Sequence, residues 1–360
     1  ICFITGGASQ NCSVISGGFR NQIGTTFGFI GGGSTNLGLG LYSAIGGGTL
    51  NCATGLVSNV LGGGCNRATG DYSNVVGGFT NTSSGRYSFV GGGNNNTASG
   101  CRSAVLGGDC NIVSGNPAFI GGGFNNRATA PYASIMGGGN NTVSSNNGFI
   151  GAGFCNNVTD FSSMVGSGCQ STSSGRYSAV LGGAENVASA CYSSVTGGFR
   201  TNTYLYGQQG QASGYFSTAG DAQATNLTAR ITASLSSGGS AKLSLDGTGT
   251  TNLLIPNGSN RVWGVEINAV AVATIAGGTV VLGDAMQGKY VLLFKEIGGV
   301  SSVVGVNTAN TTYDASMTTA NFSFSAGLVG DLAITFNAPT TASSTTFRIV
   351  AQITLSEVAY

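Results

Sequence analysis

The residues able to do acid–base chemistry are few in this 360-residue chain. It contains 12 Asp and Glu residues and no histidine. Without histidine, a Ser-His-Asp triad and most zinc sites are excluded. Hydrolysis of a glycosidic bond requires two carboxylates about 5–10 Å apart. The first 205 residues contain only four carboxylates, Asp71, Asp109, Asp160 and Glu185.

These four carboxylates are too widely spaced to form a pair within one chain. Asp71 is at position 1 and Asp160 at position 15 of the sequence repeat described below, and about six repeats separate them, about 29 Å at the spacing of adjacent β-strands. We therefore expect no enzymatic activity, no cofactor and no metal, although carboxylates of different chains could meet in an assembly. The later acidic residues occur singly, as expected of turns and strand ends: Asp221, Asp246, Glu266, Asp284, Glu296, Asp314, Asp331 and Glu357.

Glycine dominates the composition, with 64 residues, whereas charged residues make up 7% and the formal net charge is +1. This combination is typical of a folded, turn-rich β protein and differs from collagen and from disordered polar chains. The near-neutral charge offers no basic surface for nucleic acid or an anionic membrane. No apolar run approaches the ~20 residues of a membrane span. We expect neither nucleic-acid binding nor membrane insertion.

The nine cysteines all precede residue 192. Their odd number and uneven spacing fit small buried thiols better than a disulfide framework, and no CxxC pair indicates zinc.

A 15-residue repeat organises the first part of the chain. Thirteen units follow one another without insertion from Asn11 to about Leu205, and the sequence TSSGRYS therefore recurs in one frame at 82–88 and 172–178. Position 5 is Val or Ile in every unit, position 8 is always Gly, and position 11 is Asn in eleven units. A fixed period of this kind is typical of a solenoid.

Two short strands are expected in each unit, one at positions 2–6 and one near positions 10–14. Positions 4 and 6 exchange volume, so that Phe29 accompanies Gly31 whereas Ala104 accompanies Leu106. Two positions that share one limited space behave in this way. We predict a left-handed β-roll solenoid with these position-5 residues in its core: Val60, Val75, Val90, Val105, Ile120, Ile135 and Ile150.

The length of one coil has two possible values, because a weaker 45-residue period overlies the shorter one. Cys65, Cys110 and Cys155 follow this longer period. The small core residues could not fill a coil of the longer period, so we predict that each coil consists of a single repeat unit of the shorter period.

A thin roll of this kind would leave an apolar stripe in water. Three identical chains around one axis would cover it, and we predict a homotrimer. The candidate stripe residues are Phe29, Phe89, Phe119 and Phe149.

Three polar features of the repeat could bind a ligand. Arg86–Tyr87 and Arg176–Tyr177 could contact a glycan through the ring and the guanidinium, although exposed Arg also simply keeps a fibre soluble. The Asn column at position 11 could bind sugar hydroxyls, but amide ladders and left-handed turns explain it better. The Thr and Ser column at position 14 leaves ice binding as a minor alternative. Two sequons, at Asn81 and Asn157, permit glycosylation.

The chain changes character at Gly220, where the Gly-Gly frame stops and alternating segments begin. Nine or ten strands in about 140 residues predict an antiparallel β-sandwich or jelly roll. We therefore divide the chain into a solenoid shaft (1–205), a linker with a variant repeat (206–219) and a C-terminal β-sandwich domain (220–360).

Two resemblances add to this interpretation. The consensus YSAVLGGGxNxATGDYS, assembled from 42–55 and 68–73, resembles the head repeats of trimeric autotransporter adhesins of the YadA type, but its period is longer than theirs by a single position and its Gly is doubled. The match covers 11–205 and QASGYFSTA at 211–219. The C-terminal segment is similar to a domain common in phage and virus tail-fibre proteins, through GDAQ at 220–223, LSLDG at 243–247, IPNGSNRVWGVEI at 255–267 and FRIVAQI at 347–353.

The resemblance to tail-fibre proteins implies a virion surface fibre that is extracellular and attaches to a host-cell glycan or receptor. Its expected partners are two further copies of itself, the host surface and other virion proteins. A cellular trimeric surface adhesin is the first alternative, and a fibre-associated polysaccharide depolymerase is the second.

Overall fold

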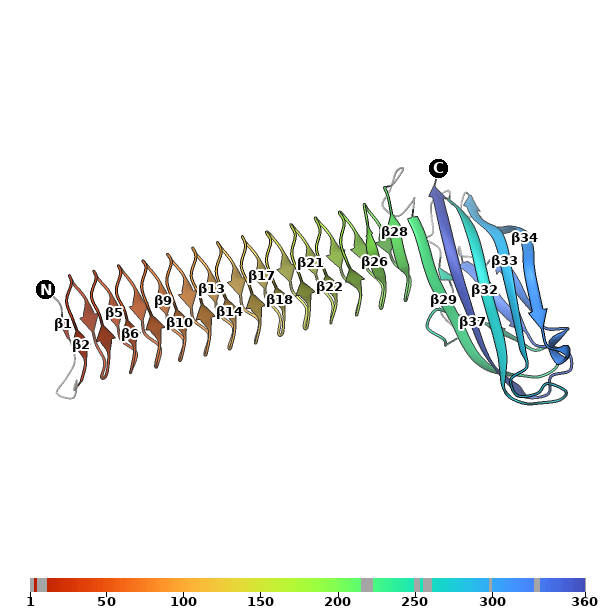
Figure 1. Cartoon of the computed structure of the whole chain (residues 1–360), viewed down its shortest axis with the longest axis horizontal. Helices are drawn as coiled ribbons and strands as arrows, with labels where there is room; N and C mark the ends of the chain where they lie inside the picture. The colour runs from red at the N-terminus through yellow and green to blue at the C-terminus, as the bar shows by residue number, and fades with distance from the viewer. Residues whose placement is uncertain are drawn as a thin grey trace. The chain divides into compact units, whose positions relative to one another are not determined.

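The computed structural model describes residues 3–4, 12–214, 223–248, 253–254, 261–297, 300–326 and 331–359. The chain divides into two compact units, Ile1–Gly183 and Ala184–Tyr360. Figure 1 shows the short strands of the coils and the long strands of the C-terminal β domain. Within the described ranges, the one helix is the short 3-10 helix η1 (Ala315–Met317). No helix in these ranges is long and apolar enough to cross a membrane. The all-β fold predicted from the sequence is confirmed.

The first unit is a β-solenoid in which each coil is a single sequence repeat, which confirms the shorter of the two predicted periods. Its strands pair in parallel with the strands one coil away, so that Phe89 lies opposite Ala104 and Val90 opposite Val105. The first ladder contains β2 (Val14–Ile15), β4 (Phe29–Ile30), β6 (Ala44–Ile45), β8 (Asn59–Val60), β10 (Asn74–Val75), β12 (Phe89–Val90), β14 (Ala104–Val105), β16 (Phe119–Ile120), β18 (Ser134–Ile135), β20 (Phe149–Ile150), β22 (Met164–Val165) and β24 (Ala179–Val180).

The second ladder of this unit has the same parallel register, as in Thr82 opposite Thr97. It contains β1 (Phe3–Ile4), β3 (Gln22–Ile23), β5 (Leu37–Gly38), β7 (Cys52–Ala53), β9 (Arg67–Ala68), β11 (Thr82–Ser83), β13 (Thr97–Ala98), β15 (Ile112–Val113), β17 (Arg127–Ala128), β19 (Thr142–Val143), β21 (Asn157–Val158) and β23 (Thr172–Ser173).

Each coil has three sides rather than two, and its strands are much shorter than predicted, as in the pair Phe89–Val90. The third side is a ladder of single bridges at position 9, such as Phe79 opposite Asn94. Left-handed backbone at positions 2, 8 and 10 bends the chain after every few residues. In one coil these residues are Tyr87 (φ 60°), Gly93 (φ 87°) and Asn95 (φ 54°). Only position 8 is always Gly. The residue types therefore indicated the bend at position 8 and gave no sign of the bends at positions 2 and 10.

Positions 3, 5, 11, 13 and 15 point inward and fill the coil, while positions 4, 6, 12 and 14 point outward. The position-5 residues proposed for the core are fully buried, from Val60 to Ile150. The cysteines differ from our expectation. Cys12 and Cys191 are exposed, and the other six described cysteines are partly exposed, because they occupy the turns and outward positions of the coil.

The second unit contains the last coil strands and an antiparallel β domain. The coil strands are β25 (Val187–Ala188), β26 (Ser194–Gly198), β27 (Asn202–Thr203) and β28 (Gln209–Ala212). Strand β28 pairs antiparallel with β29, so the coil pattern reaches Ala212. The functional division that we placed at residue 205 remains a prediction.

The large sheet of this domain has the strand order β28-β29-β37-β32-β33-β34, antiparallel throughout. A smaller sheet contains β30 and β31, both paired with β36, which also pairs with β35. The strand bounds are β29 (Gln223–Leu235), β30 (Ser240–Lys242), β31 (Leu253–Leu254), β32 (Arg261–Ile275), β33 (Ala285–Ile297), β34 (Val300–Tyr313), β35 (Asn321–Ala326), β36 (Asp331–Asn337) and β37 (Thr345–Ala359).

Aromatic side chains join the two sheets into one hydrophobic core. The ring centroids of Phe336 and Phe347 are 5.2 Å apart, and those of Tyr290 and Phe324 are 4.9 Å apart. Trp263 is 1% exposed in the same core. The predicted antiparallel sheets are confirmed. The sequence of β34 gives a weak strand signal, because it is rich in Ser, Asn and Thr and lacks regular apolar alternation. The predicted motifs at 215–222 and 255–260 lie outside the described residues.

Candidate saccharide-binding surfaces

The Arg-Tyr pairs predicted as glycan contacts lie on the turn formed by positions 1 and 2 of the coil. Tyr87 is 44% exposed, and the guanidinium carbon of Arg86 lies 4.9 Å from its ring centroid. The guanidinium also donates a 3.3 Å hydrogen bond to the Tyr87 hydroxyl. Arg176 lies 5.4 Å from the ring of Tyr177, which is 41% exposed. Each pair therefore presents an aromatic ring and a cation together.

Further aromatic residues extend these two pairs along the turn. Tyr72 stacks on Tyr87 at a centroid distance of 4.9 Å, and Phe161 meets Tyr177 edge to face at 5.6 Å. The stacking of Tyr72 on Tyr87 follows from the left-handed conformation at position 2, which repeats in each coil and holds the two rings one rung apart. Phe161 is instead at position 1 of its coil. The structure does not bring the two Arg-Tyr pairs together, since six coils separate them, about 29 Å.

A second aromatic column at position 9 was missed by the sequence reasoning. Phe79, Phe124 and Phe154 are each more than half exposed. The Phe79 ring lies against Gly64 of the preceding coil, where an added Cβ would be 3.0 Å from the ring. The sequence signal was a Phe directly after the paired glycines. The exposed rings of this column in the first unit are Phe19, Phe79, Phe124 and Phe154.

The Asn column at position 11 faces the interior and is unavailable to a ligand. The amide of Asn96 donates hydrogen bonds to the carbonyls of Gly92 (2.9 Å) and Gly108 (2.8 Å). Its carbonyl oxygen accepts one from the backbone N–H of Asn111 at 3.0 Å. Asn81 is likewise 0% exposed, so its sequon cannot be glycosylated in the folded coil. The predicted ladder of Asn side chains along the coils is present. The left-handed backbone conformation, however, is adopted by the residue before Asn, at position 10.

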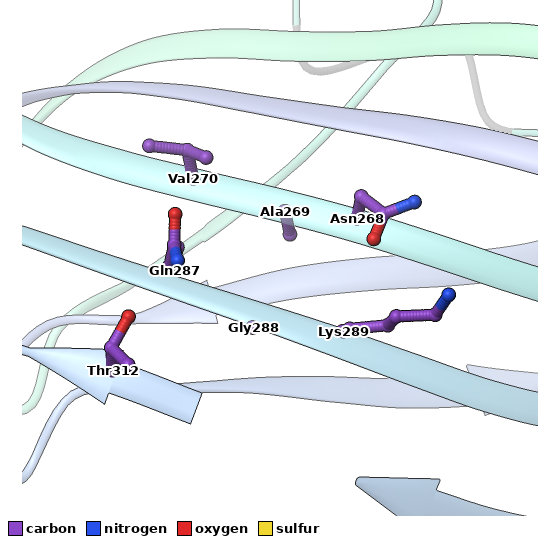
Figure 2. A pocket seen from close by; sticks show the side chains of 7 residues that line it. All are labelled: Asn268, Ala269, Val270, Gln287, Gly288, Lys289 and Thr312. Carbon is purple, nitrogen blue, oxygen red and sulfur yellow. The ribbon is translucent and has the colours of Figure 1, made fainter. Parts of the chain in front are cut away.

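The antiparallel domain carries a polar groove of about 240 Å³ on the outward face of β32, β33 and β34. Figure 2 shows the side chains of Asn268, Gln287, Lys289 and Thr312 around it. The pairing of β32 with β33 places Asn268 opposite Lys289. Amide, hydroxyl and ammonium groups on one face can hydrogen-bond to saccharide hydroxyls. A neighbouring groove of about 340 Å³ shares Gln287 and Thr312 and continues to Asp314.

An ion pair borders the first groove. The Lys289 ammonium lies 2.7 Å from the Glu266 carboxylate. This hydrogen bond and the positive charge lower the pKa of Glu266. A general acid needs a raised pKa, so Glu266 is suited to remain ionised.

Two acidic residues that we described as isolated lie at the same corner of the domain. The register Met286 opposite Tyr313 places Asp284, just before β33, beside Asp314, just after β34. Asp314 accepts a 2.8 Å hydrogen bond from the backbone N–H of Ala285. Hydrogen bonds from Ser316 and from the Val281 backbone lower the pKa of Asp284. The sequence could not reveal this pair because the whole β33–β34 hairpin lies between the two residues in the chain.

The four carboxylates of the coils are used in local contacts. Asp71 accepts a hydrogen bond from the Leu56 backbone, and Asp109 accepts one from the Asn94 amide. Asp160 accepts one from the Phe161 backbone, and Glu185 forms an ion pair with Arg200. Within the described residues, no group of three or more Cys, Asp or Glu side chains could hold a metal ion.

No protein-family profile and no curated protein sequence matches the chain. Similar solved structures include the tailspike protein of Acinetobacter baumannii phage AM24, with 9% identity and a TM-score of 0.27 over 89% of this chain and 78% of that one. The tailspike of Acinetobacter phage vB_ApiP_P1 has 10% identity and a TM-score of 0.27 over 95% and 72%. Tailspike gp49 of A. baumannii bacteriophage Fri1, described as a capsular polysaccharide depolymerase, has 9% identity and a TM-score of 0.20 over 96% and 71%.

These similarities correct one expectation. We expected no enzymatic activity, but a similar structure is that of a depolymerase, which is an enzyme, and we withdraw that expectation. At such TM-scores no residue of this chain takes a role from the tailspikes. The neighbours are phage tail proteins, whereas the resemblances to autotransporter head repeats and to a C-terminal fibre domain remain predictions.

Proposed function

We propose that this chain is a phage or virus surface fibre of the tailspike kind, and that it attaches to host-surface polysaccharide. The observation that carries this proposal is the pair of exposed aromatic sites in the coils, Arg86 with Tyr87 and Arg176 with Tyr177. A saccharide can pack against the exposed part of an aromatic ring while a guanidinium donates hydrogen bonds to its hydroxyls. Sites in a fixed frame suit a polymer, which can occupy several of them at once.

Such a fibre would act outside the cell as part of a virion. Its partners would be the host polysaccharide, other virion proteins and two further copies of this chain in a homotrimer. The apolar outward residues of the first unit support the homotrimer, because an exposed stripe of several hundred Å² normally marks an interface.

The proposal is tested with capsular polysaccharides purified from a panel of bacterial strains, using biolayer interferometry on the full chain. We expect saturable binding to at least one of them. The double variant Tyr87→Ala/Tyr177→Ala should lose about 1–3 kcal/mol of binding free energy, roughly 5- to 150-fold in affinity. Thr97→Ala, on the position-12 ladder, is the control and should bind like the parent. Unchanged affinity in the double variant would exclude these rings as the contact surface.

A polysaccharide depolymerase is the second candidate, and the presence of Asp284 and Asp314 at one corner of the domain favours it. Asp314 lines the end of the second groove, and the register of β33 and β34 brings Asp284 to the same corner. The lowered pKa of Asp284 suits a base or a nucleophile rather than an acid. The bound polysaccharide should then release reducing ends with the parent chain and far fewer with Asp314→Asn, which retains an acceptor for the Ala285 N–H. Equal release by parent and variant would exclude this corner as the catalytic site.

A further inference from the structure

The outward face at positions 4 and 6 of the coils has an unusual composition, and we call it the position-4 face. No charged residue occurs at these two positions between Cys12 and Gly183. All nine charged residues of that segment lie at positions 1, 2, 9, 10, 12 or 15. Large apolar side chains on this face are exposed to a large extent: Val14, Phe29, Leu61, Val76, Leu106, Met136 and Leu181.

The opposite ladder shows that this composition is not general to the coil. Its outward positions 12 and 14 carry Arg67 and Arg127 together with many Thr and Ser residues. Both faces are parallel ladders in which each strand pairs with the strand one coil away. The absence of charge distinguishes the position-4 face from the opposite ladder, as expected of a surface that a protein partner covers.

The exchange of volume within each coil specifies the shape of this face. Where position 4 is Phe, position 6 is Gly, as in Phe89 and Gly91. Where position 6 is Leu or Met, position 4 is small, as in Ala104 with Leu106 and Ser134 with Met136. The protruding Leu106 and Met136 side chains are 52% and 48% exposed. These coils thus present one large and one small side chain, side by side.

Rotational symmetry makes this pattern complementary to itself. A rotation axis parallel to the direction of coil stacking brings position 6 of one chain against position 4 of the next chain in the same coil. Met136 of one copy then meets Ser134 of its neighbour, and Leu106 meets Ala104. A two-fold axis perpendicular to the stack would instead oppose position 4 with position 4, and the volumes would not match coil by coil.

We propose that the position-4 face is covered by the same face of further copies of this chain, related by an axis parallel to the coil stack and in register coil by coil. This inference rests on the homotrimer proposed above and adds its surface, its symmetry axis and its register.

Paired cysteine substitutions test the register. In Ser134→Cys/Met136→Cys, the two thiols of one chain remain about 6.6 Å apart along the strand, beyond the Cβ separation of about 3.5–4.5 Å that a disulfide requires. The proposed register places each thiol beside its counterpart on a neighbouring chain. Mild oxidation should therefore convert most of the protein into covalent dimers and higher species on non-reducing gels.

The matched control is Thr142→Cys/Ser144→Cys, which places the same pair on the outward positions 12 and 14. Residues 134 and 142 are partly exposed, and residues 136 and 144 are exposed. The control and the parent, which has its own cysteines, should form no comparable covalent species.

The mass of each protein in solution separates the possible failures. An oligomer without cross-links at 134 and 136, or with cross-links at 142 and 144, would overturn the proposed face and register but leave the homotrimer intact. A folded monomer would overturn both. Neither result depends on polysaccharide binding, which is measured separately.

Discussion

The Asn residues at position 11 are polar side chains enclosed in the narrow interior of the coil. Asn156 is 1% exposed, and its amide donates hydrogen bonds to the carbonyls of Ala152 and Gly168. Its carbonyl oxygen accepts one from the backbone N–H of Ser171. One side chain thereby satisfies three backbone groups, which explains why Asn recurs in an otherwise apolar and hydroxyl-lined interior.

This role predicts a difference between two adjacent residues. Asn156→Ala should lower the free energy of unfolding by about 1–3 kcal/mol, because it leaves buried backbone groups without partners. Asn157→Ala, which removes an outward side chain at position 12, should change it by less than about 0.5 kcal/mol. Urea unfolding at one protein concentration compares the two variants. Equal losses would contradict the assignment of the ladder.

The two consecutive glycines at positions 7 and 8 of a coil also differ in how well they should tolerate a side chain. A Cβ at Gly107 would meet nothing within 4 Å, whereas at Gly108 (φ 93°) it would lie 2.2 Å from the Gly123 carbonyl oxygen. We expect Gly107→Ala to be neutral within about 0.5 kcal/mol and Gly108→Ala to cost at least about 1–3 kcal/mol. Thermal unfolding of both variants checks this. A destabilised Gly107→Ala would show that the turn is more crowded than described.

Among the elements, the hairpin of β33 and β34 positions the second candidate site. The Asp284 carboxylate lies at the start of this hairpin and accepts two hydrogen bonds. One comes from the backbone N–H of Val281, and the other comes from the hydroxyl of Ser316 in η1. The same hydrogen bonds lower the pKa of Asp284. Because these hydrogen bonds favour the ionised carboxylate, the conformation of this corner should depend on pH.

A carboxyl whose pKa is lower in the folded state stabilises the fold above its unfolded pKa, and this contribution is lost as the pH falls through the folded value. The parent should therefore lose stability at the β33–β34 corner as the pH falls below about 4. Asp284→Asn should be less stable than the parent at neutral pH and depend less on pH in that acid range. Hydrogen exchange of the η1 and β33 amides measures both effects. An identical acid dependence in the two proteins would refute this role.

The whole molecule is expected to be an obligate homotrimer. In the first unit, many large side chains outside the coil are apolar and at least half exposed, such as Leu61 and Leu106. A core built from Val, Ile, Ala, Ser and Asn is small, so in the proposed trimer contacts between chains would supply part of the stability.

Light scattering should accordingly give three times the chain mass of 35.6 kDa. The unfolding temperature should rise with protein concentration, since dissociation and unfolding are linked. Met136→Arg should lower that temperature far more than Thr142→Arg, because Arg already occurs at position 12 in Arg67 and Arg127. A folded monomer with a concentration-independent transition would exclude the trimer.

The sequence by itself determined the periodic features of this protein. Val60 and Val75 could be assigned to one interior column because a frame without insertions repeats the same local environment in every coil. Alternating apolar residues after Gly220 likewise predicted antiparallel strands, since a sheet with one buried face imposes that alternation.

Only the tertiary structure decided the features that depend on backbone conformation or on contacts distant in the chain. The left-handed conformation of Tyr87 and Asn95 made each coil three-sided, and no residue type signals it as Gly does at position 8. The proximity of Asp284 to Asp314, and the groove between Asn268 and Thr312, follow from the register of β32, β33 and β34. That register is set by pairing across long stretches of chain, which periodicity does not encode.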